Sequence, residues 1–426
     1  MKNIKTGLLS RGPQLFKAGI NLAFQNNIDK TVESLSQMKG LPQKFGQLLS
    51  MDFSEYFPED IRQKFEILQG EGKSIDFYEL HAVIKSHLPI ERIQKIHSID
   101  TTPLGAGSIG QVHRARIDEL GEVVFKIKYP NIEKTINSDL SLLLPVVAAF
   151  KLIRPQVNDL EIVIKETKKL LAHEMDYVRE RNYFHYFKAA LKQHPQFVVP
   201  EVYADYSSHE FFCMQFVEGI PLKDFIKDPA VTLERKQKVA THMLELFIKE
   251  FIELRTVQTD PNFANYLITN DDRIVLLDFG ATLEFSSSFI DEYTQLLIAA
   301  YEHDRKNILK YGEKFGLIYE KDNLEAQNIF EDFLKDVFNQ FKPENNPVNF
   351  KNSGLTSRLM EKGWNLWKKQ RISNPHSDLL FLHRKIGGLF SLLKESGVNI
   401  DLSLLWPQIL KYRESPEKVI SPEDLH

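Results

Sequence analysis

Apolar side chains change their spacing along this chain, and the changes predict where helices give way to strands. Over residues 1–95 they recur at intervals of three and four, as in SLSQMKGLPQKFGQLLS and PEDIRQKFEILQG, which predicts helices. Over residues 101–128 they alternate around a glycine-rich segment and the turn ELGE at 119–122, which predicts a β-hairpin and a third strand. A helical region therefore precedes a strand-rich one.

Helical spacing returns after these strands. It runs from Ile132 to Gln193 and gives way to two or three strands in FVVPEVYADYSSHEFFCMQFVEG, which ends at Gly219. Beyond Gly219 the pattern is mainly helical, with a loop-rich interruption at 260–280. The whole pattern predicts an α+β protein.

Composition narrows the range of partners. The chain has 426 residues, of which 42% are hydrophobic and 26% charged, as in ordinary globular proteins. It carries 54 basic and 58 acidic side chains, a net charge of −4. Because no global positive field is present, we expect no nucleic-acid partner.

The single cysteine and the length of the apolar runs bear on the compartment. Cys213 can form no intrachain disulfide, which fits a reducing compartment. The longest apolar run, Leu140 to Phe150, contains Pro145 and is shorter than the roughly 20 residues of a spanning helix. We expect a cytoplasmic protein without a transmembrane segment.

The N-terminal segment is basic and amphipathic. It has no acidic residue before Asp29, and apolar side chains between Leu15 and Phe24 share one helical face. Such a segment can lie peripherally on anionic lipid, although segments of this kind more often pack on their own domain. In a eukaryote it also suits a leader that directs the protein to the mitochondrial matrix side.

The glycine-rich segment GAGSIGQV at 105–112 has the form Gly-x-Gly-x-x-Gly-x-Val, and the strand-like run VVFKIK follows with Lys126. This pairing is typical of a loop that covers ATP phosphates. Glycines admit close approach of phosphate oxygens, and Val112 can pack on adenine. The alternative is an ordinary hairpin turn. The predicted loop residues are Gly105, Ala106, Gly107, Ser108, Gly110 and Val112.

Two further motifs lie downstream in the order that phosphoryl transfer requires. DPNFAN at 260–265 has the Asp-x-x-x-x-Asn spacing of a kinase catalytic loop, in which Asp260 orients the acceptor and Asn265 binds a metal. A predicted strand at 273–277 leads to Asp278 of an Asp-Phe-Gly motif, a second Mg²⁺ ligand. Alone, the hexapeptide could be a polar turn; together the motifs predict a kinase-like ATP and Mg²⁺ site.

Lys126 needs an anionic partner to hold its ammonium near phosphates. In kinase-like folds a helix supplies a glutamate. The segment LAHEMDYVRERN offers Glu174, Asp176 and Glu180, the last two on one helical face. The alternative is a solvated charged helix face.

In this order the motifs resemble the UbiB/ADCK family of atypical kinases, in particular the branch of coenzyme Q biosynthesis kinases. The hallmark K-x-G-Q stands as KFGQ from Lys44 to Gln47, and E-x-D stands as Glu174-Met175-Asp176. The strings SIGQVHRA, INSDL, EMDYVRE, QTDPNFAN and LLDFGAT are also similar to the family's. Beyond Gly280 the match fades, apart from scattered tryptophans and LHRKIGGLFSLLKESGV.

The resemblance implies a two-lobed protein-kinase-like fold. A helical extension with the K-x-G-Q motif would occupy 1–95, a β-rich N-lobe 96–218 with a helical insertion at about 131–172, and a mainly helical C-lobe 219–426. It further implies that the helix bearing Lys44 and Gln47 folds across the nucleotide site and meets Glu174 and Asp176. Glu180 then becomes the partner of Lys126.

The chain departs from the family and from ordinary protein kinases at particular positions. Gly105 and Gly107 stand where relatives usually carry alanine. No A-P-E signal follows Gly280, where ATLEFSSSFIDEYTQLL predicts an early helix capped by a serine. Gln258 stands where the histidine of H-R-D is expected.

These features predict three functions. The first is an ATP (or ADP) and Mg²⁺-dependent kinase or ATPase that supports ubiquinone biosynthesis by acting on or near a lipid-derived, prenylated small molecule. The second is a conventional Ser/Thr protein kinase. The third is a non-catalytic nucleotide- or lipid-binding scaffold that assembles biosynthetic enzymes.

Overall fold

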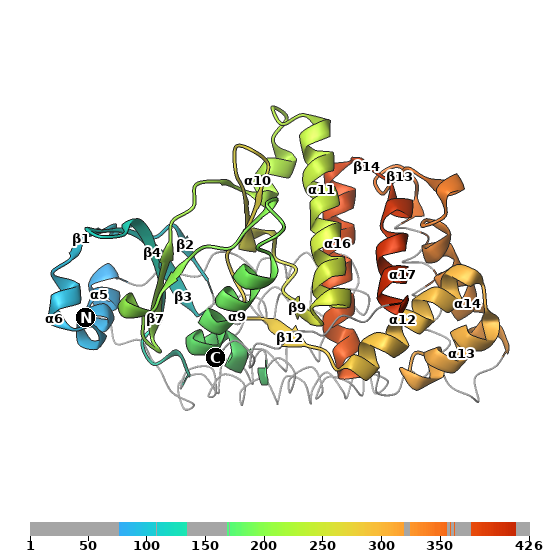
Figure 1. Ribbon diagram of the computed structural model, residues 1–426, viewed down its shortest axis with the longest axis horizontal. Coiled ribbons are helices and arrows are strands. Elements are labelled where there is room, and N and C mark those ends of the chain that lie inside the picture. The colour runs from blue at the N-terminus through green and yellow to red at the C-terminus, as the bar shows by residue number, and fades with distance from the viewer. Residues whose placement is uncertain are drawn as a thin grey trace, which may run out of the picture. The chain divides into compact units, whose positions relative to one another are not determined.

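The computed structural model describes residues 76–107, 109–133, 168–169, 171–318, 324–355, 358, 362 and 376–414. Most of the expected N-terminal extension and helical insertion lies outside these residues, as do Ser108, Lys44 and Gln47. The chain divides into two compact units. Unit 1 is Met1–His185 with Pro200–Val217, and unit 2 is Tyr186–Val199 with Glu218–His426. Figure 1 labels their elements.

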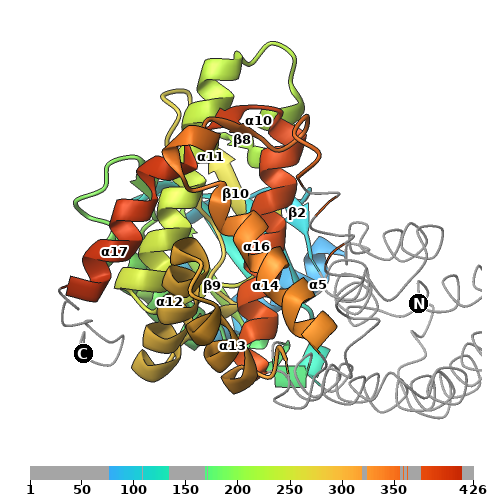
Figure 2. The ribbon, with the colours of Figure 1, turned by 90° about the vertical axis from the view of Figure 1, so that its right-hand side faces the viewer.

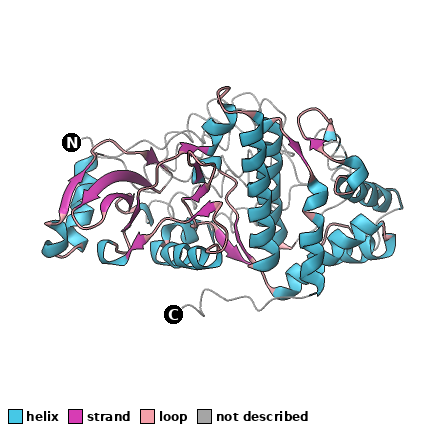
Figure 3. Ribbon diagram, turned by 45° about the horizontal axis from the view of Figure 1, so that its top comes forward, coloured by secondary structure: helices cyan, strands magenta, loops and turns pink. Residues whose placement is uncertain are grey.

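Unit 1 is built on an antiparallel sheet of six strands. The strand order is β1-β3-β4-β7-β6, with β2 added beside β3. The strands are β1 (Ile96–Ile99), β2 (Gly105–Ala106), β3 (Gly110–Ile117), β4 (Gly121–Lys128), β6 (Val202–Tyr203) and β7 (Phe211–Gln215) (Figure 3). The hairpin and third strand predicted over 101–128 are therefore confirmed.

The β3–β4 hairpin follows from alternation and from one glycine. Along β3, Gln111, His113, Ala115 and Ile117 are buried, every second residue, so one face of the strand meets the core. Gly121 begins β4 with φ +76, a left-handed conformation that glycine adopts without strain. The turn therefore fixes a register that pairs all eight residues of each strand.

Helices pack on this sheet. α5 (Phe77–His87) is capped by Asp76, whose side chain accepts a hydrogen bond from the Tyr78 backbone N–H. The short α6 (Ile90–Ile93) follows. In α9 (Tyr177–Ala190), Tyr177 and Phe184 contact Phe212 of β7 edge-on, with ring centroids 5.2 and 5.8 Å apart. These rings attach the first half of α9 to the sheet.

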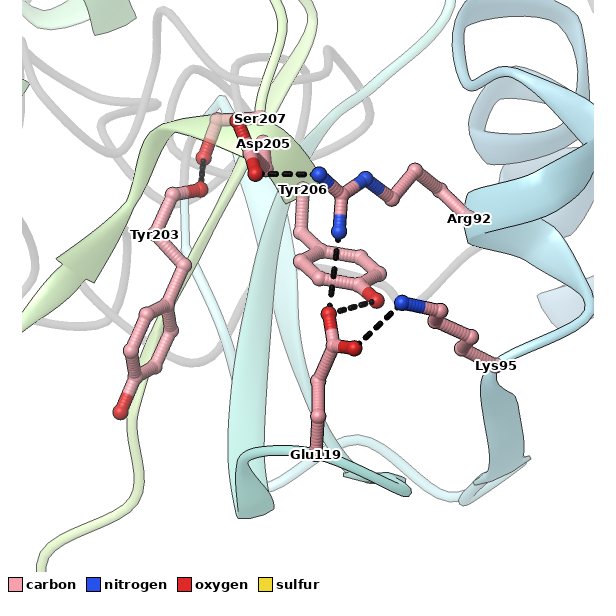
Figure 4. Close-up of polar contacts among 7 residues, drawn as sticks. All are labelled: Arg92, Lys95, Glu119, Tyr203, Asp205, Tyr206 and Ser207. Carbon is pink, nitrogen blue, oxygen red and sulfur yellow. Dashed lines mark hydrogen bonds and ion pairs between the residues drawn. The ribbon is translucent and has the colours of Figure 1, made fainter.

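A cluster of charged side chains joins α6 to the hairpin turn (Figure 4). Glu119 accepts hydrogen bonds from Arg92 at 3.0 Å and from the Tyr206 hydroxyl at 2.8 Å, and it pairs with Lys95. Arg92 also pairs with Asp205. Because all four charged side chains are at least 30% exposed, each ion pair contributes little to stability.

Unit 2 is mainly helical. α11 (Leu233–Ile248) is capped by Thr232, whose side chain accepts a hydrogen bond from the Arg235 N–H, and it continues into a π-helix at Lys249–Glu253. α16 (Ser377–Ser396) packs beside α11 (Figures 1 and 3). The other helices are α10 (Leu222–Lys227), α12 (Ser287–Glu302), α13 (Arg305–Lys314), α14 (Leu324–Asn339) and α17 (Trp406–Glu414) (Figure 2).

The helix predicted soon after Gly280 is confirmed as α12. It begins at Ser287, and the Ser286 hydroxyl caps it by accepting a hydrogen bond from the Phe289 N–H.

Within the described part of the chain, no helix is both long and apolar enough to cross a bilayer. Cys213 in β7 is fully buried, and burial raises the pKa of its thiol, as expected for a small core side chain.

The loop-rich region of unit 2 contains several short strands. One sheet has the order β5-β11-β10-β8, with β5 (Phe197–Val198), β8 (Ile220–Pro221), β10 (Tyr266–Ile268) and β11 (Ile274–Leu276). β9 (Thr256–Gln258) pairs with β12 (Thr282–Glu284), and β13 (Val348–Asn349) pairs with β14 (Asn399–Ile400). β11 confirms the strand predicted before Asp278, whereas β9, β10 and β12 are too short to produce a readable alternation.

Candidate active site

The glycine loop of unit 1 is closed by backbone hydrogen bonds. Gly105 pairs with Val112 across β2 and β3, and the Gly107 N–H donates to the Gly110 carbonyl at 2.8 Å. The Tyr129 hydroxyl donates to the Gly107 carbonyl at 3.3 Å, and burial raises the pKa of Tyr129 to about 12. Tyr129 therefore remains a donor at neutral pH. Sequence reasoning missed this tether, because a tyrosine after a strand carries no motif signal.

The three loop glycines are not equivalent. A Cβ on Gly110 would lie 2.2 Å from the Ile127 carbonyl oxygen, so the hairpin requires glycine there. A Cβ on Gly105 would meet nothing within 4 Å, and one on Gly107 would meet only the Gly110 oxygen at 3.8 Å. Neither of the latter two has the positive φ that favours glycine. The fold therefore does not require glycine at either position. The absence of a Cβ leaves open space beside the backbone there, as close approach of a phosphate requires.

Lys126 and Glu180 form a buried ion pair. Lys126 Nζ donates to both carboxylate oxygens of Glu180, at 2.7 and 3.0 Å. The Glu180 side chain is fully buried and that of Lys126 is 13% exposed. Lys126 lies directly opposite Val112 in the β3–β4 register, so both side chains project from the same face of the sheet. The pair fixes the ammonium on the face that carries the glycine loop.

The two acidic residues of the E-x-D segment lie just before α9. The Asp176 carboxylate accepts a hydrogen bond from the Arg179 backbone N–H at 2.9 Å, the geometry of an N-cap. Glu174 is buried, at 8% exposure, in the helical turn at 171–175. Their predicted meeting with Lys44 and Gln47 lies outside the described residues.

In unit 2 the loop DPNFAN turns back on itself. Asn262 accepts a hydrogen bond from the Ala264 N–H and starts the short 3₁₀ turn Phe263–Asn265. This turn brings Asn265 Nδ2 to Asp260 Oδ2 at 3.1 Å. Because Asn265 uses its nitrogen for this bond, its Oδ1 is the atom suited to bind a metal.

Asp278 is adjacent to this loop. The Leu277 N–H donates to the Asn265 carbonyl at 3.0 Å, and Asp278 follows Leu277 in the chain. The Asp278 carboxylate accepts from the Gly280 N–H at 2.8 Å, while Phe279 is buried and stacks on Phe187 at 4.5 Å. An amide oxygen and a carboxylate fit Mg²⁺, which takes oxygen ligands and few of them from protein.

Two basic residues of α16 reach the same loop, and sequence reasoning did not assign them. Arg384 Nη2 lies 3.3 Å from Asp260 Oδ1. Lys385 Nζ donates to Gln258 Oε1 at 3.2 Å and to the Tyr266 hydroxyl at 2.8 Å. The available signal was the adjacent pair of basic residues in the otherwise apolar helical string FLHRKIGGLF.

A strand lysine paired with a helix glutamate, and an Asp-x-x-x-x-Asn loop beside Asp-Phe-Gly, are the parts with which kinase-like proteins transfer phosphoryl groups. The fold and these residues define a kinase-like protein. The family described as "ABC1 atypical kinase-like domain" matches residues 67–312, and the chain belongs to this family. The resemblance to atypical kinases read from the sequence is thereby confirmed.

Individual relatives agree with this assignment. The chain is 30% identical over 393 residues to "Atypical kinase COQ8, mitochondrial" of Saccharomyces cerevisiae, covering 91% of this chain and 77% of that protein. It is 28% identical to "Atypical kinase coq-8, mitochondrial" of Caenorhabditis elegans and to "Atypical kinase COQ8B, mitochondrial" of Danio rerio. These matches cover 90% and 91% of this chain, but the chain spans only 51% and 60% of those two proteins.

A solved structure supports the fold. The structure titled as the complex of Rv3197 with erythromycin from Mycobacterium tuberculosis superposes with a TM-score of 0.62. The similarity covers 86% of this chain and 90% of the other, at 23% sequence identity. At this identity the comparison shows a shared fold and nothing about ligands.

Proposed function

We propose that this protein is an ATP-binding, Mg²⁺-dependent atypical kinase or ATPase that supports ubiquinone biosynthesis. Its reaction would act on or near a lipid-derived, prenylated small molecule. The observation that carries the proposal is the Lys126–Glu180 pair, in which a fully buried carboxylate holds an ammonium with two hydrogen bonds. An ion pair of this kind is costly to bury, so its presence on a strand paired with the glycine-loop strand favours a phosphate-binding role.

Each residue has a proposed task. Lys126 binds the α- and β-phosphates, with Glu180 fixing its position, while the glycine loop covers the phosphates. Asn265 and Asp278 hold Mg²⁺, which supplies charge neutralisation on the phosphate oxygens when bound. Asp260 orients the nucleophile, either an acceptor hydroxyl or water. Catalysis on this account rests on positioning and on electrostatics.

The lipid-related part of the proposal rests on relatives and on the N-terminus. Curated relatives are named as mitochondrial COQ8 kinases, and the basic amphipathic segment suits contact with an anionic membrane. We propose a protein of the cytoplasm, or of the mitochondrial matrix side in a eukaryote, that binds the membrane peripherally and works with biosynthetic enzymes. Lys44 and Gln47 would close the nucleotide site against Glu174 and Asp176.

A conventional protein kinase is the second candidate, favoured by Gly105 and Gly107. Those glycines restore the ordinary kinase loop in place of the family's alanines. Against it stands α12, which begins at Ser287 and leaves little chain after Gly280 to form a shelf for a protein substrate. Incubation with labelled ATP and cell extract distinguishes the two, since only a protein kinase labels other proteins.

Nucleotide binding through Mg²⁺ tests the proposal. We expect ATP to raise the midpoint of thermal unfolding of the wild type with Mg²⁺ and much less with EDTA, because ligand binding stabilises the native state. Asp278→Asn should lose at least tenfold in Mg²⁺-dependent ATP affinity. The matched control is Asp291→Asn, an exposed carboxylate on α12 that should behave as wild type. Equal ATP affinity in Asp278→Asn and wild type would refute the metal assignment.

A further inference from the structure

α16 presents a buried arginine to the proposed catalytic aspartate. Arg384 and Asp260 lie 124 residues apart in sequence, yet Arg384 Nη2 is 3.3 Å from Asp260 Oδ1. The arginine side chain is 1% exposed and that of Asp260 is 11% exposed. Asn265 Nδ2 binds the other carboxylate oxygen at 3.1 Å. With a donor on each oxygen, the Asp260 carboxylate is held in one rotational orientation.

The next residue of α16 fixes the segments on both sides of the loop. Lys385 Nζ donates to Gln258, which lies two residues before Asp260, and to the hydroxyl of Tyr266, which follows Asn265. The Tyr266 hydroxyl in turn donates to Gln258 Oε1 at 3.3 Å. Lys385 therefore ties the strand that enters the loop to the strand that leaves it.

The backbone of α16 also touches the loop directly. A Cβ on Gly388 would lie 2.3 Å from Pro261 Cβ and 3.2 Å from Pro261 Cα, so only glycine fits at this approach. Gly388 is four residues after Arg384 and shares its helical face. The adjacent Gly387 points elsewhere, since a Cβ there would meet nothing within 4 Å.

We infer that α16 is the positioning element of the catalytic loop. Gly388 sets how closely the helix approaches the loop, Lys385 holds the loop ends, and Arg384 is a positioning residue that acts through Asp260. This inference rests on the proposed function, in which Asp260 orients the nucleophile. It assigns a task to the one C-terminal string that resembles the family beyond Gly280.

The two neighbouring glycines give a matched test of the contact. Both substitutions to alanine gain the same intrinsic helix propensity, but only one creates a clash. Gly387→Ala should keep or raise the midpoint of thermal unfolding and keep wild-type ATP turnover. Gly388→Ala should lower the midpoint by about 5 °C and lower kcat at least tenfold. Identical behaviour of the two variants would overturn the inference even if the wild type hydrolysed no ATP.

A double-mutant cycle tests whether Arg384 works through Asp260. Arg384→Met should lower kcat about tenfold or more and leave KM for ATP within about threefold, while Arg384→Lys should restore part of the loss. In the Asp260→Asn background, Arg384→Met should cause no further loss. The same loss in both backgrounds would show a merely structural arginine and would contradict the inference.

The cycle separates the two proposals. If Asp260→Asn retains wild-type turnover, the proposed function of Asp260 fails. If Asp260→Asn loses turnover but Arg384→Met does not, only the inference about α16 fails. Should Arg384→Met not fold, Arg384→Lys and the glycine pair decide the question.

Discussion

At the scale of single residues, the three loop glycines differ in whether the fold requires them. Gly110 is required by the hairpin, whereas Gly105 and Gly107 have space for a Cβ and no left-handed backbone. The sequence alone could not distinguish the three glycines, because the Gly-x-Gly-x-x-Gly motif requires all of them equally. The fold does not require glycine at 105 or 107, so we predict that these two positions bear on the ligand and not on folding.

Alanine substitutions test this separation. Gly110→Ala should lower the free energy of unfolding by about 3 kcal/mol, because its Cβ meets backbone. Gly105→Ala and Gly107→Ala should leave it unchanged within about 1 kcal/mol and weaken ATP binding about fivefold, since each adds a methyl group where phosphate approaches. Denaturant unfolding and ATP titration measure both quantities. Unchanged ATP affinity in the Gly105 and Gly107 variants would place the phosphates elsewhere.

Glu180 illustrates how a buried carboxylate differs from an exposed one. Glu180→Gln should lower the free energy of unfolding by about 3 kcal/mol, because it leaves the Lys126 charge without its partner anion. It should also weaken ATP binding at least tenfold. Glu122→Gln, in the same sheet but with its Arg114 pair on the surface, is the control and should change either quantity little. If both substitutions changed the free energy of unfolding and the ATP affinity by similar amounts, the buried pair would have no special role.

At the scale of secondary-structure elements, the sequence predicts those elements that a local pattern of residues determines. The β3–β4 hairpin, β11 and the serine cap of α12 follow from alternation, a short apolar run and a capping residue. The contacts of α16 with the catalytic loop and its flanking strands could not be predicted, because they join residues at least 119 apart and rely on the absence of one methyl group. The other three-residue strands, β9, β10 and β12, could not be predicted, because each is too short to show an alternation.

The π-helix at the end of α11 places Glu250 in the core. Burial raises the pKa of Glu250 to about 7, and the Lys385 charge 3.8 Å away opposes the rise only in part. Burial also acts to lower the pKa of Lys385, but Tyr266, Glu250 and Asp260 outweigh it, and the net direction is upward. Lys385 therefore stays charged while Glu250 titrates near neutrality.

This titration predicts a pH dependence of stability. The folded-state pKa of Glu250 lies above its unfolded value, so its protonated form stabilises the fold fully below about pH 4.5, and this contribution is lost as pH rises to about 7. Relative to Glu250→Gln, the wild type should lose about 3 kcal/mol of unfolding free energy between pH 4.5 and 8. Urea unfolding of both proteins at the two pH values measures the difference. A difference that does not change with pH would contradict the assignment.

At the scale of the whole molecule, the family and the kinase-like architecture could be predicted from spaced motifs, because phosphoryl transfer demands particular side chains in a particular order. The partner of Lys126 was also within reach, since the E-x-D resemblance favoured Glu180 over its neighbours. What the sequence could not supply is the support behind these residues, such as Tyr129 on the loop carbonyl or Arg384 behind Asp260. The roles of Lys44, Gln47 and the basic N-terminus remain predictions.

The central claim is that this chain uses ATP and Mg²⁺ catalytically, and one measurement tests it most directly. ATP turnover by the full chain should be measured with Mg²⁺ on anionic liposomes for the wild type and for Asp260→Asn. We predict steady turnover by the wild type, and in Asp260→Asn a kcat reduced at least a hundredfold with ATP affinity within about threefold of wild type. Absence of turnover by the wild type, or equal turnover by the two proteins, would contradict the account and favour a non-catalytic scaffold.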